Sequence, residues 1–208
     1  LGELDAGAIT APDRKETFAT SGPRMKVRFF AAYEFAPDLL DSPELAASAY
    51  RSGVSMGGDL AADGSKQPAF LVWASADPVG TPLQRVQIIK GYLDNGQHQE
   101  RIYDVACSDG LVPDPATGRC PDNGARVNLA DCSITAGVGA SELKALWRDP
   151  DFDPAQEAFY YLRVLENPTC RWSTWDANRL GIEPNPDLQK TIQERAYTSP
   201  IWFIPTKN

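Results

Sequence analysis

Histidine is almost absent from this sequence: His98 is the only one among 208 residues. A Ser-His-Asp triad would have to use it, and no G-x-S-x-G nucleophile elbow is present. One histidine is also too few for a metal site built from several imidazoles. Because His98 lies just after an Asn-Gly turn signal, we interpret it as an exposed turn residue. The scarcity of histidine therefore argues against triad and histidine-metal chemistry.

Runs of basic residues are also missing. The 20 Lys and Arg residues are outnumbered by 28 Asp and Glu residues, which gives a formal net charge of −8. Nucleic acids and anionic membrane surfaces attract clusters of Lys and Arg, so neither is an expected partner. The longest apolar runs, such as "AFLVWASA", are too short to span a bilayer. With no signal peptide and no initial methionine visible, the chain is interpreted as a short natural protein, a proteolytic fragment or a piece of a longer one.

The four cysteines include no C-x-x-C pair, which argues against zinc-ribbon and thioredoxin-like sites. Three of them lie in a stretch rich in Pro, Gly and Asp, where a long loop with little core of its own gains stability from cross-links. We therefore predict two disulfides and an oxidising compartment, and three pairings stay open. The alternative is four thiols in a cytosolic protein. The residues concerned are Cys107, Cys120, Cys132 and Cys170.

Strand signals dominate the rest of the chain. The clearest is "QRVQIIKGYLDNGQHQERIYDVAC", in which Asn95-Gly96 supplies the positive φ angles of a tight hairpin turn. "SELKALW" fits either a strand or a helical turn. Further strands are predicted where β-branched and aromatic residues run between Gly and Pro: "ETFATS", "KVRFFAAY", "AFLVWASAD", "ARVNLADCSI", "AFYYLRVLEN" and "QERAYTSPIWFIP".

One segment carries clear helix signals. "DSPELAASAYRSG" has Asp41 or Ser42 as N-cap, Pro43 in the first turn and Gly53 as a stop. Seventeen prolines and sixteen glycines punctuate the chain. The pattern predicts a mainly β protein: an antiparallel β-sandwich with long loops and one or two short helices.

The stretch "RDPDFDPAQEA" places Asp149, Asp151 and Asp153 at alternate positions, like the start of a calcium loop. The pattern then fails, because Pro154 follows at once and the glycine of the sharp turn and the closing glutamate are absent. We interpret the stretch as a turn. The alternative is a calcium or magnesium site that also uses Glu157, in a carboxylate-based metal-dependent hydrolase.

The stretch "CRWSTWDANR" places Trp172 and Trp175 three residues apart, between Arg171 and Arg179. Tryptophans of this kind pack in a core, pack at a domain interface, or stack on a ligand such as a sugar ring. We favour packing. The alternative is a carbohydrate or small-ligand binding module in which Trp172, Trp175 and Tyr197 form a stacking platform.

Six stretches together resemble one family, in order over about residues 14–204. They resemble the C-terminal portion of the DUF3604 proteins, which are of unknown function and related to the PHP-type metal-dependent phosphoesterases. The stretches are "RKETFATSGPRMKVRFF", "GVSMGGDL", "FLVWASADP", "LQRVQIIKGYLD", "WRDPDFDPAQEAFYYLRVLENPTCRWSTWDA" and "IQERAYTSPIWF".

The resemblance implies that catalysis belongs to an N-terminal PHP-like barrel whose His and Asp ligands hold divalent metals. Those motifs have no counterpart in this sequence, so we assign no metal ligand and no cofactor to this chain. Residues 1–24 would be an N-terminal segment at the barrel exit, and residues 25–208 a β-sandwich C-terminal domain. Thr20, Ser21 and Arg24 would then lie near the barrel's active site. Arg24 would contact an anionic substrate there or form a salt bridge to the sandwich.

We therefore expect a non-catalytic accessory domain that completes and covers such a barrel, with an apolar surface patch where the barrel docks. Its partner would be that barrel, another subunit or a second copy in a homo-oligomer. Proteins of this family often carry export signals, so the resemblance, like the cysteines, implies a periplasmic or secreted location.

Overall fold

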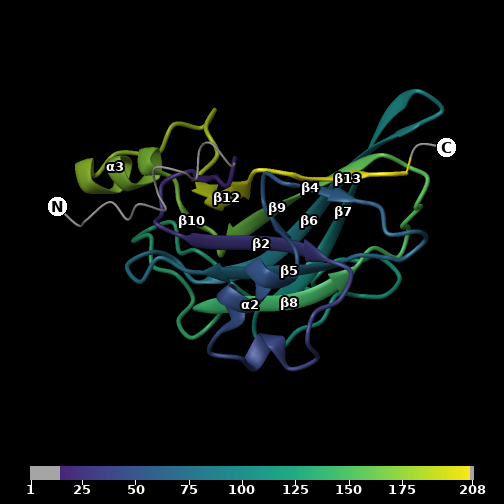
Figure 1. Cartoon of the computed structure of the whole chain (residues 1–208). Coiled ribbons are helices and arrows are strands. Elements are labelled where there is room, and N and C mark those ends of the chain that lie inside the picture. The colour runs from purple at the N-terminus through teal and green to yellow at the C-terminus, as the bar shows by residue number, and fades with distance from the viewer. Residues whose placement is uncertain (1–14, 207–208) are drawn as a thin grey trace.

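The computed structural model describes residues 15–206, and most of its strands form two sheets packed face to face (Figure 1). The large sheet has seven strands, and β9 lies at its centre. One edge of β9 pairs with β6, which pairs in turn with β7; the other edge pairs with β12 and then, beyond Pro200, with β13. The strands are β1 (Phe18–Thr20), β4 (Asp59–Ala61), β6 (Leu83–Asp94), β7 (Gln97–Cys107), β9 (Ala158–Glu166), β12 (Arg195–Thr198) and β13 (Ile201–Ile204).

The small sheet has four antiparallel strands in the order β3-β2-β5-β8. Its outer face is covered by a short 3-10 helix, η1, and by helix α2, whose Leu45 and Ala49 pack on Phe30 and Leu71. Because both faces are buried, β5 is an almost continuous apolar run. The elements are β2 (Lys26–Ala32), η1 (Leu39–Asp41), α2 (Leu45–Ser52), β3 (Val54–Ser55), β5 (Ala69–Ser75) and β8 (Glu142–Arg148).

The core lies between the two sheets and follows the two-residue period of the strands. Phe29 and Phe70 of the small sheet meet Ile88 and Leu162 of the large sheet, and all four are at most 1% exposed. Fully burying a side chain of this size stabilises the fold by about 2–3 kcal/mol. The predicted mainly β sandwich with two short helices is therefore confirmed.

A buried ion pair joins the large sheet to the segment that follows β8. The side chains of Lys90 on β6 and Asp149 are 2% and 0% exposed, and Nζ lies 2.6 Å from Oδ2. The Tyr160 hydroxyl donates to the same oxygen at 2.8 Å, and Lys90 also donates to the carbonyl of Asp151 at 2.8 Å. The backbone N–H of Asp151 donates to Asp149 Oδ1 at 2.9 Å. Each of the two buried charges thus has further hydrogen bonds besides the ion pair itself, which a buried pair requires.

The turn and helix predictions hold with small shifts. Asn95 and Gly96 connect β6 to β7 with φ angles of 50° and 77°, as the Asn-Gly signal predicts. "SELKALW" is a strand, β8. The helix starts at Leu45, later than expected, and Ser42 Oγ instead accepts the backbone N–H of Glu44 in the preceding turn.

Two sequence interpretations of secondary structure were wrong. The expected strand "ARVNLADCSI" is a loop with a single bridge between Val127 and Ile134, because its polar residues close local turns instead of a ladder. The segment Trp172–Leu180, not predicted as regular structure, is helix α3, and Gly181 ends it with a φ of 64°. Two further short strands, β10 (Thr169–Cys170) and β11 (Thr191–Ile192), bracket α3 and its following loop.

The four cysteines form two disulfides, which confirms the prediction and selects one of the three pairings. Cys107 pairs with Cys120, and Cys132 pairs with Cys170. In the chain-entropy treatment, closing loops of these lengths stabilises the fold by about 3 and about 4 kcal/mol. Two disulfides suggest an extracellular or periplasmic environment. Within residues 15–206, no helix combines the length and the apolar character needed to cross a bilayer.

Most of the expected N-terminal segment, residues 1–24, falls outside the described residues. Its described end contains β1, which pairs with β12 through Ala19 and Tyr197 and so belongs to the large sheet. The expected strand "QERAYTSPIWFIP", in which Pro200 indicated an edge or a bulge, is divided into β12 and β13 at Pro200, because proline lacks the N–H that a ladder needs.

The replacement Lys90→Met is expected to lower the free energy of unfolding by about 3–5 kcal/mol, because Asp149 stays buried without its counter-charge. Urea unfolding at neutral pH measures this. The exposed Lys26→Met on β2 is the matched control and should change stability by less than about 1 kcal/mol. Replacing both charges, with Lys90→Met and Asp149→Leu, should recover most of the loss. A single replacement that costs no more than the control would contradict the role given to this pair.

Candidate functional site

The outer face of the large sheet exposes a row of aromatic side chains. On β9 these residues alternate with the buried Tyr160 and Leu162, so they point away from the core. Their rings lie close together: the centroids of Phe159 and Trp202 are 5.1 Å apart, and those of Phe159 and Tyr161 are 6.3 Å apart. We call this set the aromatic surface: Phe159, Tyr161, Tyr197 and Trp202.

The aromatic surface continues into a cavity of about 480 Å³ beside the β6–β7 hairpin. The ring of Phe159 lies directly over Gly91, where a Cβ atom would come within 2.2 Å of Phe159 Cζ. Glycine at this position therefore lets the ring lie flat on β6. His98 is exposed on β7, as expected, and faces this cavity. The lining consists of residues 91–93, 98–100, 157–159 and 202.

Towards its other end the same face carries arginines from three neighbouring strands. Arg85 on β6 and Arg195 on β12 both pair with Leu165 on β9. Arg163 lies two residues before Leu165 and pairs with Tyr197. Because side chains two residues apart share a face, the three arginines point the same way.

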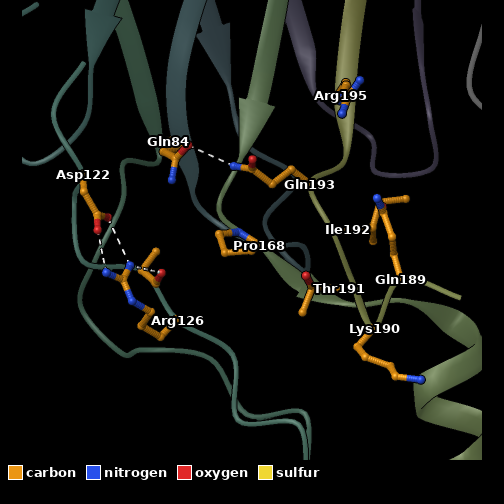
Figure 2. A pocket seen from close by; sticks show the side chains of 11 residues that line it. Gln84, Asp122, Arg126, Pro168, Gln189, Lys190, Thr191, Ile192, Gln193 and Arg195 are labelled. Carbon is orange, nitrogen blue, oxygen red and sulfur yellow. Dashed lines mark hydrogen bonds and ion pairs between the residues drawn. The ribbon is translucent and has the colours of Figure 1, made fainter. Parts of the chain in front are cut away.

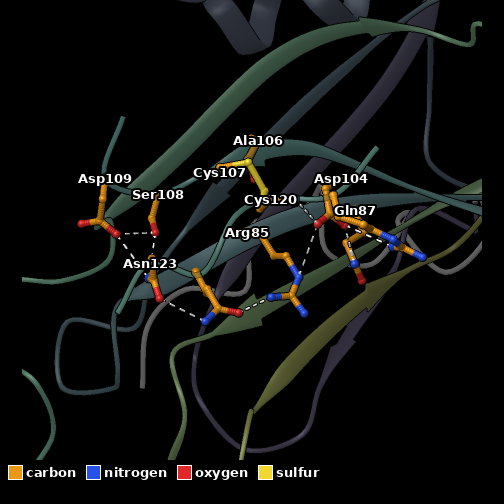
Figure 3. Close-up of a disulfide and its surroundings, with 11 residues drawn as sticks. Arg85, Gln87, Asp104, Ala106, Cys107, Ser108, Asp109, Cys120 and Asn123 are labelled. Atoms are coloured by element: carbon orange, nitrogen blue, oxygen red, sulfur yellow. Dashed lines mark hydrogen bonds and ion pairs between the residues drawn. A yellow bond between two sulfur atoms is a disulfide. The ribbon is translucent and has the colours of Figure 1, made fainter. Parts of the chain in front are cut away.

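Asp104 on β7 lies at the side of this arginine group, near the Cys107–Cys120 disulfide (Figure 3). Its carboxylate accepts hydrogen bonds from Gln87 Nε2 at 2.6 Å and from the backbone N–H of Cys120 at 2.7 Å. Arg85 Nε lies 3.8 Å away and Arg119 Nη1 lies 3.4 Å away. Asp104 therefore ties the disulfide loop to the sheet and supplies one negative charge beside the arginines.

A second cavity, of about 630 Å³, opens next to the arginines (Figure 2). Gln84 and Gln193 line it, and Gln193 Nε2 donates to Gln84 Oε1 at 2.9 Å. Arg195 reaches it from β12, and the paired Arg126 and Asp122 stand on the opposite side. The cavity is thus rich in amide and guanidinium groups.

Thr20, Ser21 and Arg24, expected near a neighbouring active site, lie at the end of β1 and in the turn after it. Ser21 Oγ donates to the Glu194 carboxylate. The backbone N–H of Arg24 donates to Asp77 Oδ2 at 2.7 Å, whereas the side chain of Arg24 is exposed. The described residues place no carboxylate within ion-pair distance of the Arg24 guanidinium.

Glu166 at the end of β9 is buried beside this turn, at 1% exposure. Its Oε1 atom has no hydrogen-bond partner among the described residues. Burial, and then the charges of Glu194 and Asp77, raise the pKa of Glu166 to about 7. The pKa of Asp77 itself is lowered, chiefly because the backbone N–H groups of Arg24 and Val79 donate to it.

The two tryptophans of α3 point largely into solvent. Trp172 is 67% exposed and Trp175 is 38% exposed. The guanidinium of Arg179 lies 5.8 Å from the centroid of the Trp175 ring. Of the two kinds of packing that the sequence favoured, core packing does not describe Trp172, because two thirds of its surface is open to solvent. Packing at a domain interface stays a prediction. Tyr197 belongs to the aromatic surface of the sheet, on a different element from this pair.

The three alternate aspartates are engaged separately. Asp149 faces Lys90 inside the sandwich, whereas Asp151 accepts the Tyr103 hydroxyl at 2.8 Å and pairs with Arg101 at 2.5 Å. Asp153 accepts the backbone N–H of Ala155 within its own turn. In the part of the chain that the structure describes, no three His, Cys, Asp or Glu side chains are grouped to hold a metal ion.

Sequence reasoning did not single out Arg85, Arg163, Arg195 or Glu166. The first three lie at outward positions of strands that were predicted, so their alternation with buried residues was visible. What the sequence does not supply is the register between strands, which brings residues 85, 163 and 195 together across more than a hundred positions.

The chain matches the family model described as "Protein of unknown function (DUF3604)" over residues 7–205. No curated protein and no solved structure matches it. The family description names no activity, so the function has to be argued from the geometry.

Stability should fall as the pH rises through the titration of Glu166. The unfolded state releases this proton near the ordinary pKa of about 4.5, whereas the folded state holds it to about 7. The folded state therefore binds more protons in this window and is destabilised by up to about 3 kcal/mol as the pH rises through it.

Replacing Glu166→Gln removes the titrating group but keeps its shape. Urea unfolding at pH values below and above this window should show that Glu166→Gln stabilises the chain on the alkaline side only. The exposed Glu157→Gln is the matched control and should leave the free energy of unfolding unchanged both below and above this pH window. Equal effects of the two replacements at every pH would show that Glu166 titrates normally.

Proposed function

This chain belongs to the DUF3604 family, and from that premise we propose that it is a non-catalytic β-sandwich domain. It would pack on a catalytic domain that resembles the PHP-type metal-dependent phosphoesterases, in the same polypeptide or in another subunit. The divalent metals of the reaction would belong to that domain. The two disulfides support a periplasmic or secreted location.

The aromatic surface is the observation that carries this proposal. Tyr197 and Trp202 are 37% and 40% exposed, and Leu93 and Ile204 beside them are 52% and 39% exposed. Contiguous apolar patches on a protein surface mark sites of interaction. Tyr, Trp, Phe and Arg are also the residue types enriched where proteins meet. The outer face of the large sheet therefore has the composition of an interface, whereas the outer face of the small sheet is covered by α2.

The path of the chain supports the choice of occupant. Ala19 of β1 pairs with Tyr197 of the aromatic surface, at the edge of the large sheet. The first described strand, β1, therefore lies beside this surface. A preceding domain would be tethered next to the face on which it packs, which raises its effective concentration there.

The exposure of Trp172 favours a second candidate, a carbohydrate or small-ligand binding module centred on α3. Trp172 and Trp175 are three residues apart on the helix and therefore share a side of it. An indole that is 67% exposed is available to stack on a sugar ring. In this alternative the ligand binds at α3, and the outer face of the large sheet stays exposed to solvent.

The first test is an activity measurement on the 208-residue chain with added manganese, magnesium or zinc. No hydrolysis of phosphomonoester or phosphodiester substrates above the metal-only rate is expected, because the proposed role is binding. Metal-dependent turnover would overturn the proposal and favour the carboxylate hydrolase. In that event Asp151→Asn and Asp153→Asn, compared with the exposed Asp94→Asn, would show whether the aspartate segment is responsible.

A further inference from the structure

The arginine group on the outer face of the large sheet has a charge balance unlike that of the rest of the protein. Arg85, Arg163 and Arg195 come from three adjacent strands, and Arg119 approaches from the disulfide loop. Leu165 is only 5% exposed in the row between Arg85 and Arg195. A chain with a net charge of −8 thus gathers four guanidinium groups on one face.

One carboxylate, that of Asp104, lies among these four cations. Arg163 and Arg195 make no ion pair with any described residue: Arg163 Nε donates to Gln87 Oε1 at 2.6 Å, and Arg195 Nη1 donates to the Tyr197 hydroxyl at 3.4 Å. Both acceptors are neutral. Like charges opposite one another on a sheet are destabilising. The group therefore holds an excess of positive charge that the described part of the chain does not neutralise.

The hydrogen-bonding state of Arg85 points the same way. Its Nε atom is buried and has no hydrogen-bond partner, because Asp104 at 3.8 Å is too distant for a hydrogen bond. Burial lowers the pKa of Arg85, and the charges of Arg163, Arg119 and Arg195 lower it further against the opposing effect of Asp104. Burial acts to raise the pKa of Tyr197, yet the hydrogen bond and charge of Arg195 and the charge of Arg163 hold it below its ordinary value. The unpaired N–H and the positive local potential therefore both favour a negative charge beside the arginine group.

From these observations we propose that Arg85, Arg163 and Arg195 bind an oxyanion such as phosphate or sulfate, carried by a small polar organic molecule that occupies the adjoining cavity. Guanidinium groups present paired N–H donors that match the oxygens of such anions. Arg195 lines the cavity directly, as does Gln84 (Figure 2). Arg85 donates to Gln84. At about 630 Å³, the cavity has the size typical of small-molecule sites.

The character of the cavity defines the rest of the ligand. Gln84, Gln193 and Thr191 offer amide and hydroxyl groups, and Arg126 and its partner Asp122 close the far side. Groups of this kind recognise hydroxyl-rich molecules by hydrogen bonds. The ligand class is therefore a phosphate or sulfate ester of a polyol or sugar. This inference goes beyond the proposed docking role: its anion-binding residues, Arg85, Arg163 and Arg195, lie outside the aromatic surface, of which Tyr197 contacts Arg195.

The test is a titration of the 208-residue chain, in phosphate-free buffer, with inorganic phosphate, inorganic sulfate and a sugar phosphate, followed by calorimetry and by thermal unfolding. Sodium chloride at matched ionic strength is the salt control. Saturable binding that raises the unfolding temperature is expected for each oxyanion, and tighter binding for the sugar phosphate. Chloride should reproduce neither effect.

The replacements Arg163→Gln and Arg195→Gln should each weaken phosphate binding about tenfold or more, since each removes charge-assisted hydrogen bonds. Arg51→Gln, on α2 behind the small sheet, is the matched control and should bind like the unmodified chain. In oxyanion-free buffer Arg195→Gln should also raise the unfolding temperature, because it relieves repulsion; this readout shows that the variant folds.

Two results would overturn the assignment. Binding that is no stronger than with chloride, or that survives both arginine replacements, would show that the group holds no oxyanion. If a sugar phosphate binds no tighter than inorganic phosphate, the cavity does not hold the organic part of the ligand. Neither result bears on whether the aromatic surface docks a partner, because that surface is formed by other side chains.

Discussion

The buried pair of Lys90 and Asp149 constrains the register of the central strands of the large sheet. Taking both charges out of water costs several kcal/mol per ion, so the pair is tolerated only where further hydrogen bonds complete it. Tyr160 and the backbone of Asp151 supply those bonds. Since Lys90 and Tyr160 are also partners across β6 and β9, this geometry fixes the register of the central strands. A slip of β6 by one residue along β9 would turn Lys90 to the outer face and leave Asp149 without its counter-charge.

The register of the strands also determines which side chains lie on the outer face of the large sheet. With Lys90 and Tyr160 directed inward, Gly91, Phe159 and Tyr161 are directed outward. The same alternation sends Arg163 and Arg195 outward further along the sheet. Aromatic contact and anion recognition would therefore lie side by side on one surface, and the chain enters that surface at β1. The disulfides hold the long loops at the arginine end, where Cys120 donates its backbone N–H to Asp104.

Local signals in the sequence were sufficient for most of the long strands, the β6–β7 hairpin and the presence of two disulfides. Each depends on residues close in the chain: alternating apolar side chains, Asn95-Gly96, and cysteines in a loop that lacks its own core. The disulfide pairing and the arginine group could not be predicted in this way, because both depend on contacts between distant segments. Helix α3 was not predicted, because its tryptophans were interpreted only as packing residues. Gly181, a residue type that commonly ends helices, was a local signal for it. Asp149 was interpreted as part of a turn, with metal binding as the alternative, because its buried partner Lys90 lies 59 residues away.

The central claim is that the outer face of the large sheet is covered in the working protein. Hydroxyl-radical footprinting tests it most directly, by comparing the protein purified from its native source with the 208-residue chain alone. We expect Trp202 and Tyr161 to be oxidised several-fold more slowly in the native protein, and Trp172 on α3 to react equally in both. Equal oxidation of Trp202 and Tyr161 in the two samples would contradict the claim. Protection of Trp172 in place of Trp202 would move the partner surface to the helix.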